Sequence, residues 1–226
     1  MSRIVVLRPE PGASETVARA KARGLDAIAI PLFAVEAMEW QAPDAHGFDA
    51  LLLTSANAVR FGGERLASLR GLPVHAVGAA TADAARDAGF DIASSGEAGV
   101  ERLLASLEPD LNLLHLCGED RTTSDGARQS VTVRTVYRSR AIEPSPRVDW
   151  AVDAAVLIHS PRAAERFANL AAEQGLDRSK TTILAISKAA ADAAGAGWKS
   201  VEAAEQPTDD ALLALAERLC DNRRQG

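Results

Sequence analysis

The apolar residues of this chain come in short unbroken runs, separated by stretches in which apolar and polar residues alternate at helical spacing. The segments 50–54, 112–116 and 154–159 are almost wholly apolar, as in strands buried on both faces. The segments 79–88 and 161–173, which follow two of the apolar runs, are predicted to be helices. Strands that alternate with helices indicate parallel sheets covered on both faces, so the pattern predicts an α/β fold.

The same pattern gives the expected element bounds. Strands are predicted at 3–7, 26–32, 50–54, 74–77, 91–93, 112–116, 131–136, 154–159, 182–186 and 199–202. Helices are predicted at 13–23, 56–69, 79–88, 99–107, 161–173, 188–196 and 209–220, and the polar stretch 121–129 is either a helix or a loop.

The chain contains a duplication. The segment 49–61 recurs as 153–167, and in each copy an Asp opens an apolar run and a Ser, Ser55 or Ser160, stands where the strand passes into a helix. The similarity extends to 74–90 with 183–198, and to 4–11 with 113–120. A long repeat that occurs only twice predicts two similar lobes rather than a solenoid.

The repeat can be divided near residue 110 or at two extended polar segments. We prefer the second division, which gives a continuous lobe at 41–137 and a discontinuous lobe made of 1–35 and 146–226, with 36–40 and 138–145 as the linker. Side by side, the two linker segments can pair as an antiparallel ladder. We expect such a hinge to leave a ligand cleft between the lobes.

Composition narrows the class of partner. The chain has 226 residues, of which 47% are hydrophobic and 25% charged, as is usual for a globular protein. Its net charge of −6 argues against nucleic acid or an anionic membrane as the main partner. Met1 is followed at once by a strand and no apolar run approaches the roughly 18 residues of a membrane span, so we expect a cytoplasmic protein.

The cysteines and histidines give no metal-binding pattern. Cys117 and Cys220 are the two cysteines, which excludes a disulfide framework and a CxxC site. His46, His75 and His115 show no ligand spacing, so we expect no metal. His159 lies on an apolar strand and is interpreted as a buried, hydrogen-bonded histidine rather than a catalyst.

Four turns join a strand to a following helix or turn. They are Ser55-Ala-Asn57, Gly78-Ala-Ala-Thr81, Gly118-Glu-Asp-Arg121 and Ser160-Pro-Arg162. The carboxyl ends of parallel strands share one edge of the sheet, and helix N-termini bind carboxylates well. The turns therefore suit an anionic ligand, although a Ser or Thr at a helix start is most often only a cap.

Seven short segments, in this order, resemble the uroporphyrinogen-III synthase family. They are Arg8-Pro9, Leu52 to Val59, Val77 to Ala82, Gly118 to Arg121, Val136-Tyr137, Ser160-Pro161 and Ala204 to Thr208. The resemblance spans nearly the whole chain. It implies a monomeric lyase without a cofactor, built of two flavodoxin-like lobes joined by a two-stranded linker. The implied reaction belongs to heme biosynthesis: hydroxymethylbilane, a linear tetrapyrrole with several carboxylates, closes to uroporphyrinogen III with loss of water and inversion of the last pyrrole ring.

The resemblance also implies site residues. Tyr137, the single tyrosine, is the candidate acid that helps the substrate hydroxyl to leave. A phenol with a pKa near 10 stays protonated at neutral pH, and general acid catalysis contributes about 10²–10⁴ in rate. Its other interpretation is a strand aromatic with no chemical role. The implied substrate-binding residues are Arg8, Ser55, Gly78, Thr81, Arg121, Ser160 and Ser187.

The second copy departs from the family pattern at one turn. Where the first copy has Gly78 to Thr81, the second has Ser187 to Ala190, so the expected hydroxyl is absent at Ala190. Either Ser187 or Lys188 would replace it. A different class of protein, a two-lobed binding or sensor module without chemistry, has the same periodicity. Tyr137 together with Thr81 favours the enzyme.

Overall fold

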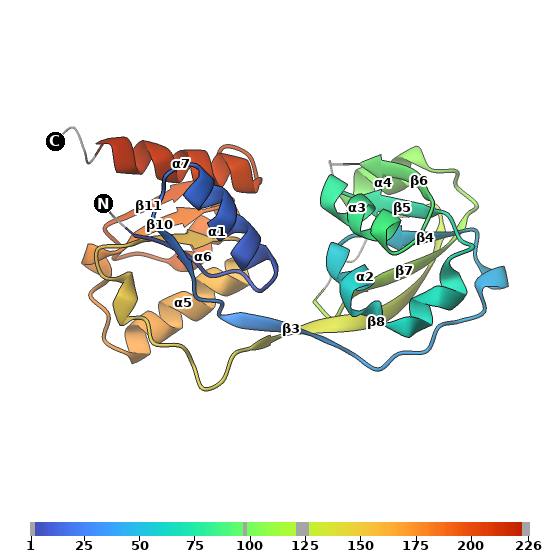
Figure 1. The fold of residues 1–226 in the computed structure, drawn as a ribbon, viewed down its shortest axis with the longest axis horizontal. Helices are drawn as coiled ribbons and strands as arrows, with labels where there is room; N and C mark the ends of the chain where they lie inside the picture. Colours follow the sequence, from blue (N-terminus) through green and yellow to red (C-terminus); the bar gives the residue numbers. More distant parts are fainter. Residues whose placement is uncertain (1–2, 97–98, 121–126, 223–226) are drawn as a thin grey trace. The chain divides into compact units, whose positions relative to one another are not determined.

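The structure is a computed structural model of the chain and describes residues 3–96, 99–120 and 127–222. It divides into two compact units (Figure 1). Unit 1 contains Met1–Ala34 and Arg140–Gly226, and unit 2 contains Val35–Ser139. The chain passes from one unit to the other within β3 (Phe33–Ala37) and again near the end of β8 (Ser130–Ala141).

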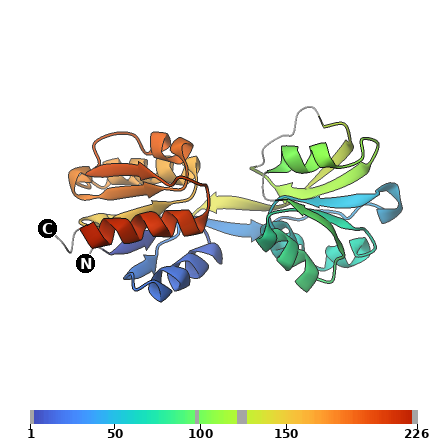
Figure 2. The ribbon, with the colours of Figure 1, turned by 90° about the horizontal axis from the view of Figure 1, so that it is seen from above.

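Unit 1 is a five-stranded parallel sheet in the order β11-β10-β9-β1-β2. Its strands are β1 (Ile4–Val6), β2 (Ala27–Ala29), β9 (Ala155–Ile158), β10 (Thr182–Ala185) and β11 (Ser200–Ala203). Its helices are α1 (Gly12–Ala22), α5 (Pro161–Glu173), α6 (Lys188–Ala194) and α7 (Asp209–Asn222). Helices α1 and α7 pack on one face of the sheet and α5 and α6 on the other (Figures 1 and 2).

Unit 2 has a six-stranded sheet in the order β3-β8-β7-β4-β5-β6. Its remaining strands are β4 (Ala50–Leu53), β5 (Val74–Val77), β6 (Ile92–Gly96) and β7 (Asn112–Gly118). Its helices are α2 (Ala56–Gly62), α3 (Ala79–Asp87) and α4 (Val100–Ser106). Helices α2 and α3 pack on one face, and α4 packs on the other. Short 3-10 segments are η1 (Ala45–Gly47) and η2 (Glu64–Leu69) here, and η3 (Asp149–Ala151) and η4 (Arg178–Lys180) in unit 1.

The duplication appears as an identical arrangement of strands. The order β11-β10-β9-β1-β2 in unit 1 corresponds to β6-β5-β4-β7-β8 in unit 2, with β3 added at the edge beside β8. The chain order differs, because β1 and β2 precede their partners in unit 1 whereas β7 and β8 follow theirs. The α/β fold class, with two flavodoxin-like parallel sheets, is confirmed.

The strands β3 and β8 pair in the antiparallel sense. The Met38 N–H donates to the Val136 carbonyl at 2.9 Å, and the Ile142 N–H donates to the Leu32 carbonyl at 3.0 Å. In both bonds the two residue numbers add to the same total, as an antiparallel register requires. These two segments form the two-stranded linker.

One predicted helix is interrupted. The spacing predicts a single helix over 56–69, but α2 ends at Gly62 and a 3-10 segment follows at Glu64–Leu69. Gly63 lies between them with a φ of 69° and a ψ of −163°, a positive-φ conformation outside the helical region that glycine adopts without strain. The apolar spacing of 56–69 continues through the break, so this spacing does not indicate that the helix ends at Gly62.

Three aromatic rings form the centre of the α5 side of unit 1. Phe167 is fully buried and stacks between Trp150 and Trp198, with ring centroids 6.0 Å and 5.2 Å away. Aromatic pairs at such distances contribute packing energy beyond the area they bury. Phe167 therefore holds α5 to η3 and to the segment that follows α6.

We predict that Phe167→Ala lowers the free energy of unfolding of unit 1 by about 3–5 kcal/mol, because it leaves a cavity between two tryptophans. Urea unfolding followed by tryptophan fluorescence measures the change. Val201→Ala, at a side chain that is 37% exposed, is the control and should change stability little. A loss below about 1 kcal/mol for Phe167→Ala would contradict this view of the core.

Candidate active site

Each sheet has one point at which the chain leaves two adjacent strands in opposite directions. In unit 2 the chain goes from β4 towards β5 but from β7 towards β8, and in unit 1 it goes from β9 towards β10 but from β1 towards β2. In open α/β sheets, ligands bind outside the carboxyl ends of the strands at this switch point. A ligand site of unit 2 is therefore expected at the residues that follow β4 and β7.

A hollow of about 300 Å³ lies at the switch point of unit 2. Thr54 and Ser55, which follow β4, form one part of its wall, and Cys117 and Gly118 at the end of β7 form another. The described residues that line it are Thr54, Ser55, Val77, Val100, Cys117, Gly118, Asp120 and Tyr137. Three predicted site segments, the serine turn, the Gly118 turn and Tyr137, thus meet at one hollow.

A β-bulge places Tyr137 over Gly118. The pairing of β7 with β8 shifts after Cys117, so that Gly118 lies opposite Tyr137 and Val136 is the extra residue. A β-carbon at position 118 would lie only 2.7 Å from ring atoms Cε2 and Cζ of Tyr137. The Glu119 N–H donates to the Tyr137 carbonyl at 3.0 Å and fixes the backbone beneath the ring. The phenol ring therefore occupies space that only glycine leaves free.

The Tyr137 phenol lines the hollow together with Ser55 and lies against Gly118. Burial raises the pKa of Tyr137 above its ordinary value, and the electrostatic effects of Cys117 and Asp120 act in the same direction. Hydrogen bonding of the phenolate by the Ser55 side chain and the Gly118 backbone would lower the pKa of Tyr137, but this effect does not outweigh burial. At neutral pH the phenol is protonated and can donate its proton.

Thr54, which lines the hollow, belongs to a pair that the sequence did not suggest. Thr54 Oγ1 and His115 Nε2 are 3.1 Å apart, and His115 is 5% exposed. The alternation along β7 puts His115 on the same face as Cys117, which lines the hollow. The alternation alone could have predicted that His115 shares a face with Cys117. The pairing of His115 with Thr54 could not be predicted in this way, because it depends on the register of β4 against β7.

The remaining predicted residues of unit 2 lie near the hollow or outside the described part of the chain. Gly78 caps α3 with a φ of 85°, donates its N–H to the Gly96 carbonyl at 2.8 Å, and directly follows Val77 of the lining. Thr81, the third residue of α3, is 5% exposed and does not line the hollow. Arg121 lies outside the described residues.

The predicted residues of unit 1 take part in caps and ion pairs. Ser160 accepts the N–H of Ala163 at 3.2 Å and caps α5 behind Pro161, and Ser187 accepts the N–H of Ala190 at 3.3 Å and caps α6. Lys188 forms an exposed ion pair, with Nζ 2.9 Å from an Asp192 oxygen. Arg8 follows β1, and its Nη1 lies 3.6 Å from an Asp209 carboxylate oxygen.

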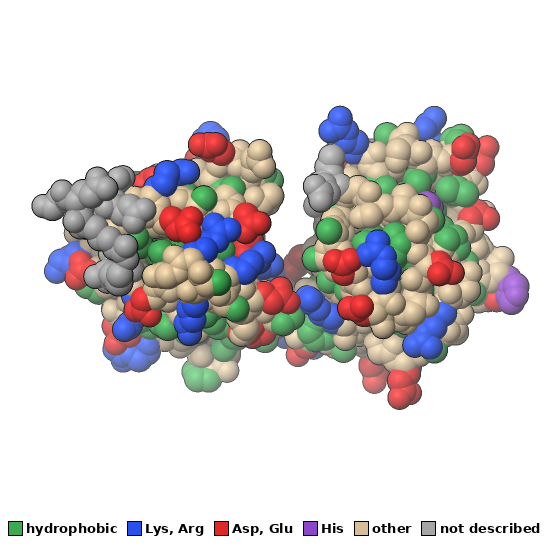
Figure 3. All heavy atoms as spheres, turned by 45° about the horizontal axis from the view of Figure 1, so that its top comes forward, with side chains coloured by type: hydrophobic (Ala, Val, Ile, Leu, Met, Phe, Trp, Pro, Cys, Tyr) green, Lys and Arg blue, Asp and Glu red, His purple; other side chains and the backbone are tan. Residues whose placement is uncertain are grey.

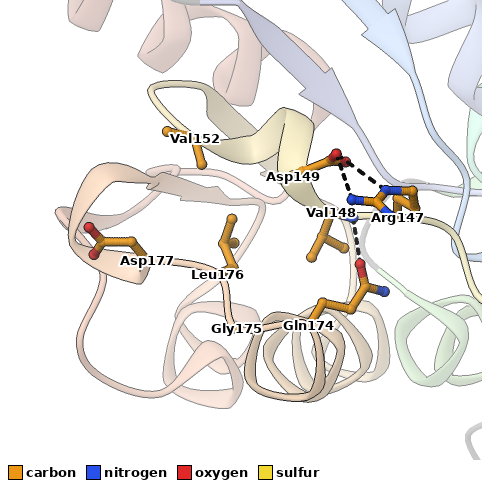
Figure 4. Close-up of a pocket in the computed structure, with 8 residues that line it drawn as sticks. All are labelled: Arg147, Val148, Asp149, Val152, Gln174, Gly175, Leu176 and Asp177. Atoms are coloured by element: carbon orange, nitrogen blue, oxygen red, sulfur yellow. Dashed lines mark hydrogen bonds and ion pairs between the residues drawn. The ribbon is translucent and has the colours of Figure 1, made fainter.

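A larger hollow, of about 550 Å³, is formed in unit 1 by residues 147–149, Val152 and 174–177 (Figure 4). Gln174 accepts the Val148 N–H at 3.0 Å, and the exposed Arg147 pairs with Asp149 at 3.0 Å. These residues precede β9 and β10 and therefore lie on the amino-end side of the strands. The position argues against a ligand site of this fold class.

Charges of both signs share the surface. On the face drawn in Figure 3, Lys and Arg side chains are interspersed with Asp and Glu. Among the residues that the structure describes, no helix is both long and apolar enough to cross a membrane.

The fold and site define an α/β protein of two flavodoxin-like units, with a protonated phenol at a strand-end hollow. The family model for uroporphyrinogen-III synthase HemD matches residues 14–214. The chain therefore belongs to the uroporphyrinogen-III synthase family, as its sequence motifs predict. No curated protein matches the chain significantly.

Solved structures share the fold. The uroporphyrinogen-III synthetase of Helicobacter pylori aligns with a TM-score of 0.68 at 19% identity, over 97% of this chain and 100% of the other. A mutant uroporphyrinogen III synthase of Thermus thermophilus aligns with a TM-score of 0.54 at 20% identity, over 98% and 100%. At these identities the likeness supports the fold alone.

Because Tyr137 is the only tyrosine, a spectrophotometric alkaline titration reports on this residue alone. We predict a pKa above the ordinary value, and a further rise in Ser55→Ala, which loses a hydrogen bond to the phenolate. Ser160→Ala, in unit 1, is the matched control and should leave the titration unchanged. A pKa at or below about 10 in the native protein would contradict the buried environment described here.

Proposed function

We infer that this chain is a uroporphyrinogen-III synthase, which closes hydroxymethylbilane to uroporphyrinogen III with loss of water and inversion of the last pyrrole ring. The family match over residues 14–214 supports this function. The structural observation that carries the proposed chemistry is the position of Tyr137, whose phenol is kept protonated by burial and lies beside Ser55 at the switch-point hollow of unit 2.

The proposed role of Tyr137 is to assist departure of the substrate hydroxyl. As the carbon–oxygen bond of the hydroxymethyl group breaks, the phenol proton passes to the leaving oxygen, and water and an azafulvenium cation form beside the phenolate. The pyrrole N–H proton then passes to the phenolate, which leaves the neutral azafulvene and restores the phenol. Burial keeps the proton on the phenol at neutral pH, so the acid is present in the required form. We therefore assign the enzyme to the lyases.

Ring inversion is assigned to binding geometry. The azafulvene reacts readily without an enzyme and gives the wrong isomer, so the protein must present the substituted carbon of the last ring for attack through a spiro intermediate. Positioning of reacting atoms contributes large rate effects without a strong nucleophile. The rigid backbone around Gly118 and the cap at Ser55 provide fixed groups of this kind.

The carboxylates of the substrate are proposed to bind at helix starts and at basic side chains. Arg8, Ser55, Gly78, Thr81, Arg121, Ser160 and Ser187 are the proposed contacts. Helix N-termini present unpaired N–H groups and a positive dipole end to an anion. Since Ser160 and Ser187 already cap α5 and α6 through their oxygens, each would bind a carboxylate through its hydroxyl proton.

We also propose that the protein works in the cytoplasm as a monomer, on a free tetrapyrrole and without nucleic acid. The net charge of −6 favours a small local anion site and argues against a broad basic surface. The lobes at 41–137 and at 1–35 with 146–226 are proposed to move about linker segments 36–40 and 138–145.

An assay with hydroxymethylbilane and isomer analysis tests the function, and Tyr137→Phe tests the role of the phenol. The native protein should give isomer III.

Tyr137→Phe should also give isomer III, at a rate lower by at most about 10²–10⁴, because the ring remains and only the proton donor is lost. A native protein that leaves the bilane to form isomer I would be a binding module. Unchanged kinetics in the variant would leave Tyr137 without a chemical role.

Gly118→Ala tests the position of the ring separately from its proton. The new methyl group would lie 2.7 Å from the ring, so Tyr137 must move, and turnover should fall at least as much as in Tyr137→Phe. Gly71→Ala is the control, because no described residue other than its chain neighbours comes within 4 Å of the position of its β-carbon. Full activity in Gly118→Ala, with the ring displaced in a crystal structure, would refute the requirement for this placement.

A further inference from the structure

A buried carboxylate gathers four side chains at the switch point of unit 1. Asp209, the first residue of α7, is 10% exposed; its oxygens lie 3.0 and 3.1 Å from Thr16 Oγ1 and 2.7 Å from His159 Nε2. Arg19 pairs with the same carboxylate, and Arg8 Nη1 lies 3.6 Å from it. We call these five residues the Asp209 cluster. It joins the turn after β1, helix α1, the end of β9 and helix α7.

The Asp209 cluster occupies the place in unit 1 that corresponds to the hollow of unit 2. In the duplication His159 matches Thr54, and Arg8 matches Cys117. Asp209 begins the helix after β11 as Val100 begins the helix after β6, and β11 corresponds to β6. Three lining residues of the hollow, Thr54, Cys117 and Val100, are thus replaced by charged or polar side chains.

The cluster carries a surplus of positive charge. Burial lowers the pKa of His159, and the charges of Arg8 and Arg19 act in the same direction, against the effect of Asp209. His159 is therefore neutral and donates from Nε2, while its buried Nδ1 has no hydrogen-bond partner in the described structure. Burial alone would raise the pKa of Asp209, but the hydrogen bond from His159, the charge of Arg19 and the hydrogen bond from Thr16 lower it. One carboxylate thus faces two guanidinium groups.

Arg8 is the member with capacity for a further anion. Only its Nη1 is engaged, with Asp209 and with Thr16 Oγ1 at 3.4 Å, so Nε and Nη2 have no partner among the described residues. Its side chain is 33% exposed, whereas those of His159 and Asp209 are 7% and 10% exposed. Gly12 makes room for the guanidinium, because a β-carbon there would lie 2.6 Å from Nε and 2.9 Å from Nη2.

We propose that Asp209 is a positioning residue, which holds the Arg8 guanidinium at the carboxyl end of β1 so that its free nitrogens bind a carboxylate of the tetrapyrrole. The proposal rests on the proposed function. A guanidinium that is held by one carboxylate keeps one orientation. Its remaining N–H groups then bind a second carboxylate with a smaller loss of side-chain entropy. The other interpretation of Asp209 is an anchor that only ties α7 to α1 and β9.

Asp209→Asn distinguishes the two interpretations, since it keeps the shape and an acceptor for His159 but removes the charge that restrains Arg8. We expect KM for hydroxymethylbilane to rise about tenfold, the effect of one charge-assisted hydrogen bond, with kcat little changed. Asp210→Asn is the matched control: its side chain is 70% exposed and pairs with Arg23 at 2.7 Å. It should leave KM unchanged.

A double-mutant cycle shows whether Asp209 acts through Arg8. Arg8→Gln should raise KM by a similar factor, and the double variant Arg8→Gln with Asp209→Asn should raise it no further. A purely structural anchor predicts that the two effects on KM multiply, or that Asp209→Asn lowers the melting temperature with KM unchanged. Either result would overturn the proposal.

A second measurement keeps the proposal separate from the proposed function. A crystal structure of Asp209→Asn should show the Arg8 guanidinium displaced from its place beside Gly12. If the native protein has no synthase activity, the function fails, and this structure still decides whether Asp209 positions Arg8. An unmoved Arg8 would refute the proposal whatever the activity.

Discussion

The order of strands in the two parallel sheets is the constraint on which the rest of the structure depends. In both units the chain leaves two adjacent central strands in opposite directions, so the segments that follow them diverge and leave their polar groups at one edge. The duplication preserved this arrangement although the two units join their strands in a different chain order. The residues at the edge then diverged: unit 2 retains a hollow lined by Thr54 and Tyr137, while unit 1 holds the Asp209 cluster.

The chemistry assigned to Tyr137 depends on backbone features more than on neighbouring charges. The bulge at Val136 turns the tyrosine towards the end of β7, and Gly118 gives the ring its space. Ser55, which caps α2 at the end of the neighbouring strand β4, lines the same hollow as the phenol. Burial by these elements keeps the phenol protonated, which suits a reaction that needs a proton donor and accurate placement of a reactive ring.

Much of the fold could be predicted from local pattern. The repeated strand, serine and helix unit predicted caps at Ser55 and Ser160, and both are present, because the cap depends only on neighbouring residues. The break at Gly63 was missed, since apolar spacing continues through it. The interactions of His115 and Asp209 were missed for another reason: Asp209 lies 193 residues from Thr16 in the chain, and only strand order brings them together. Local spacing carries no information about such contacts.

A crystal structure of the protein with uroporphyrinogen III bound would show whether the strand ends at the switch points form the binding site. We expect product carboxylates hydrogen-bonded at the Ser55 and Gly118 turns, with the Tyr137 hydroxyl facing the tetrapyrrole, and one carboxylate on Arg8. Product bound in the larger hollow at 147–149 and 174–177, with the Tyr137 hollow free of it, would refute a binding site at the switch points.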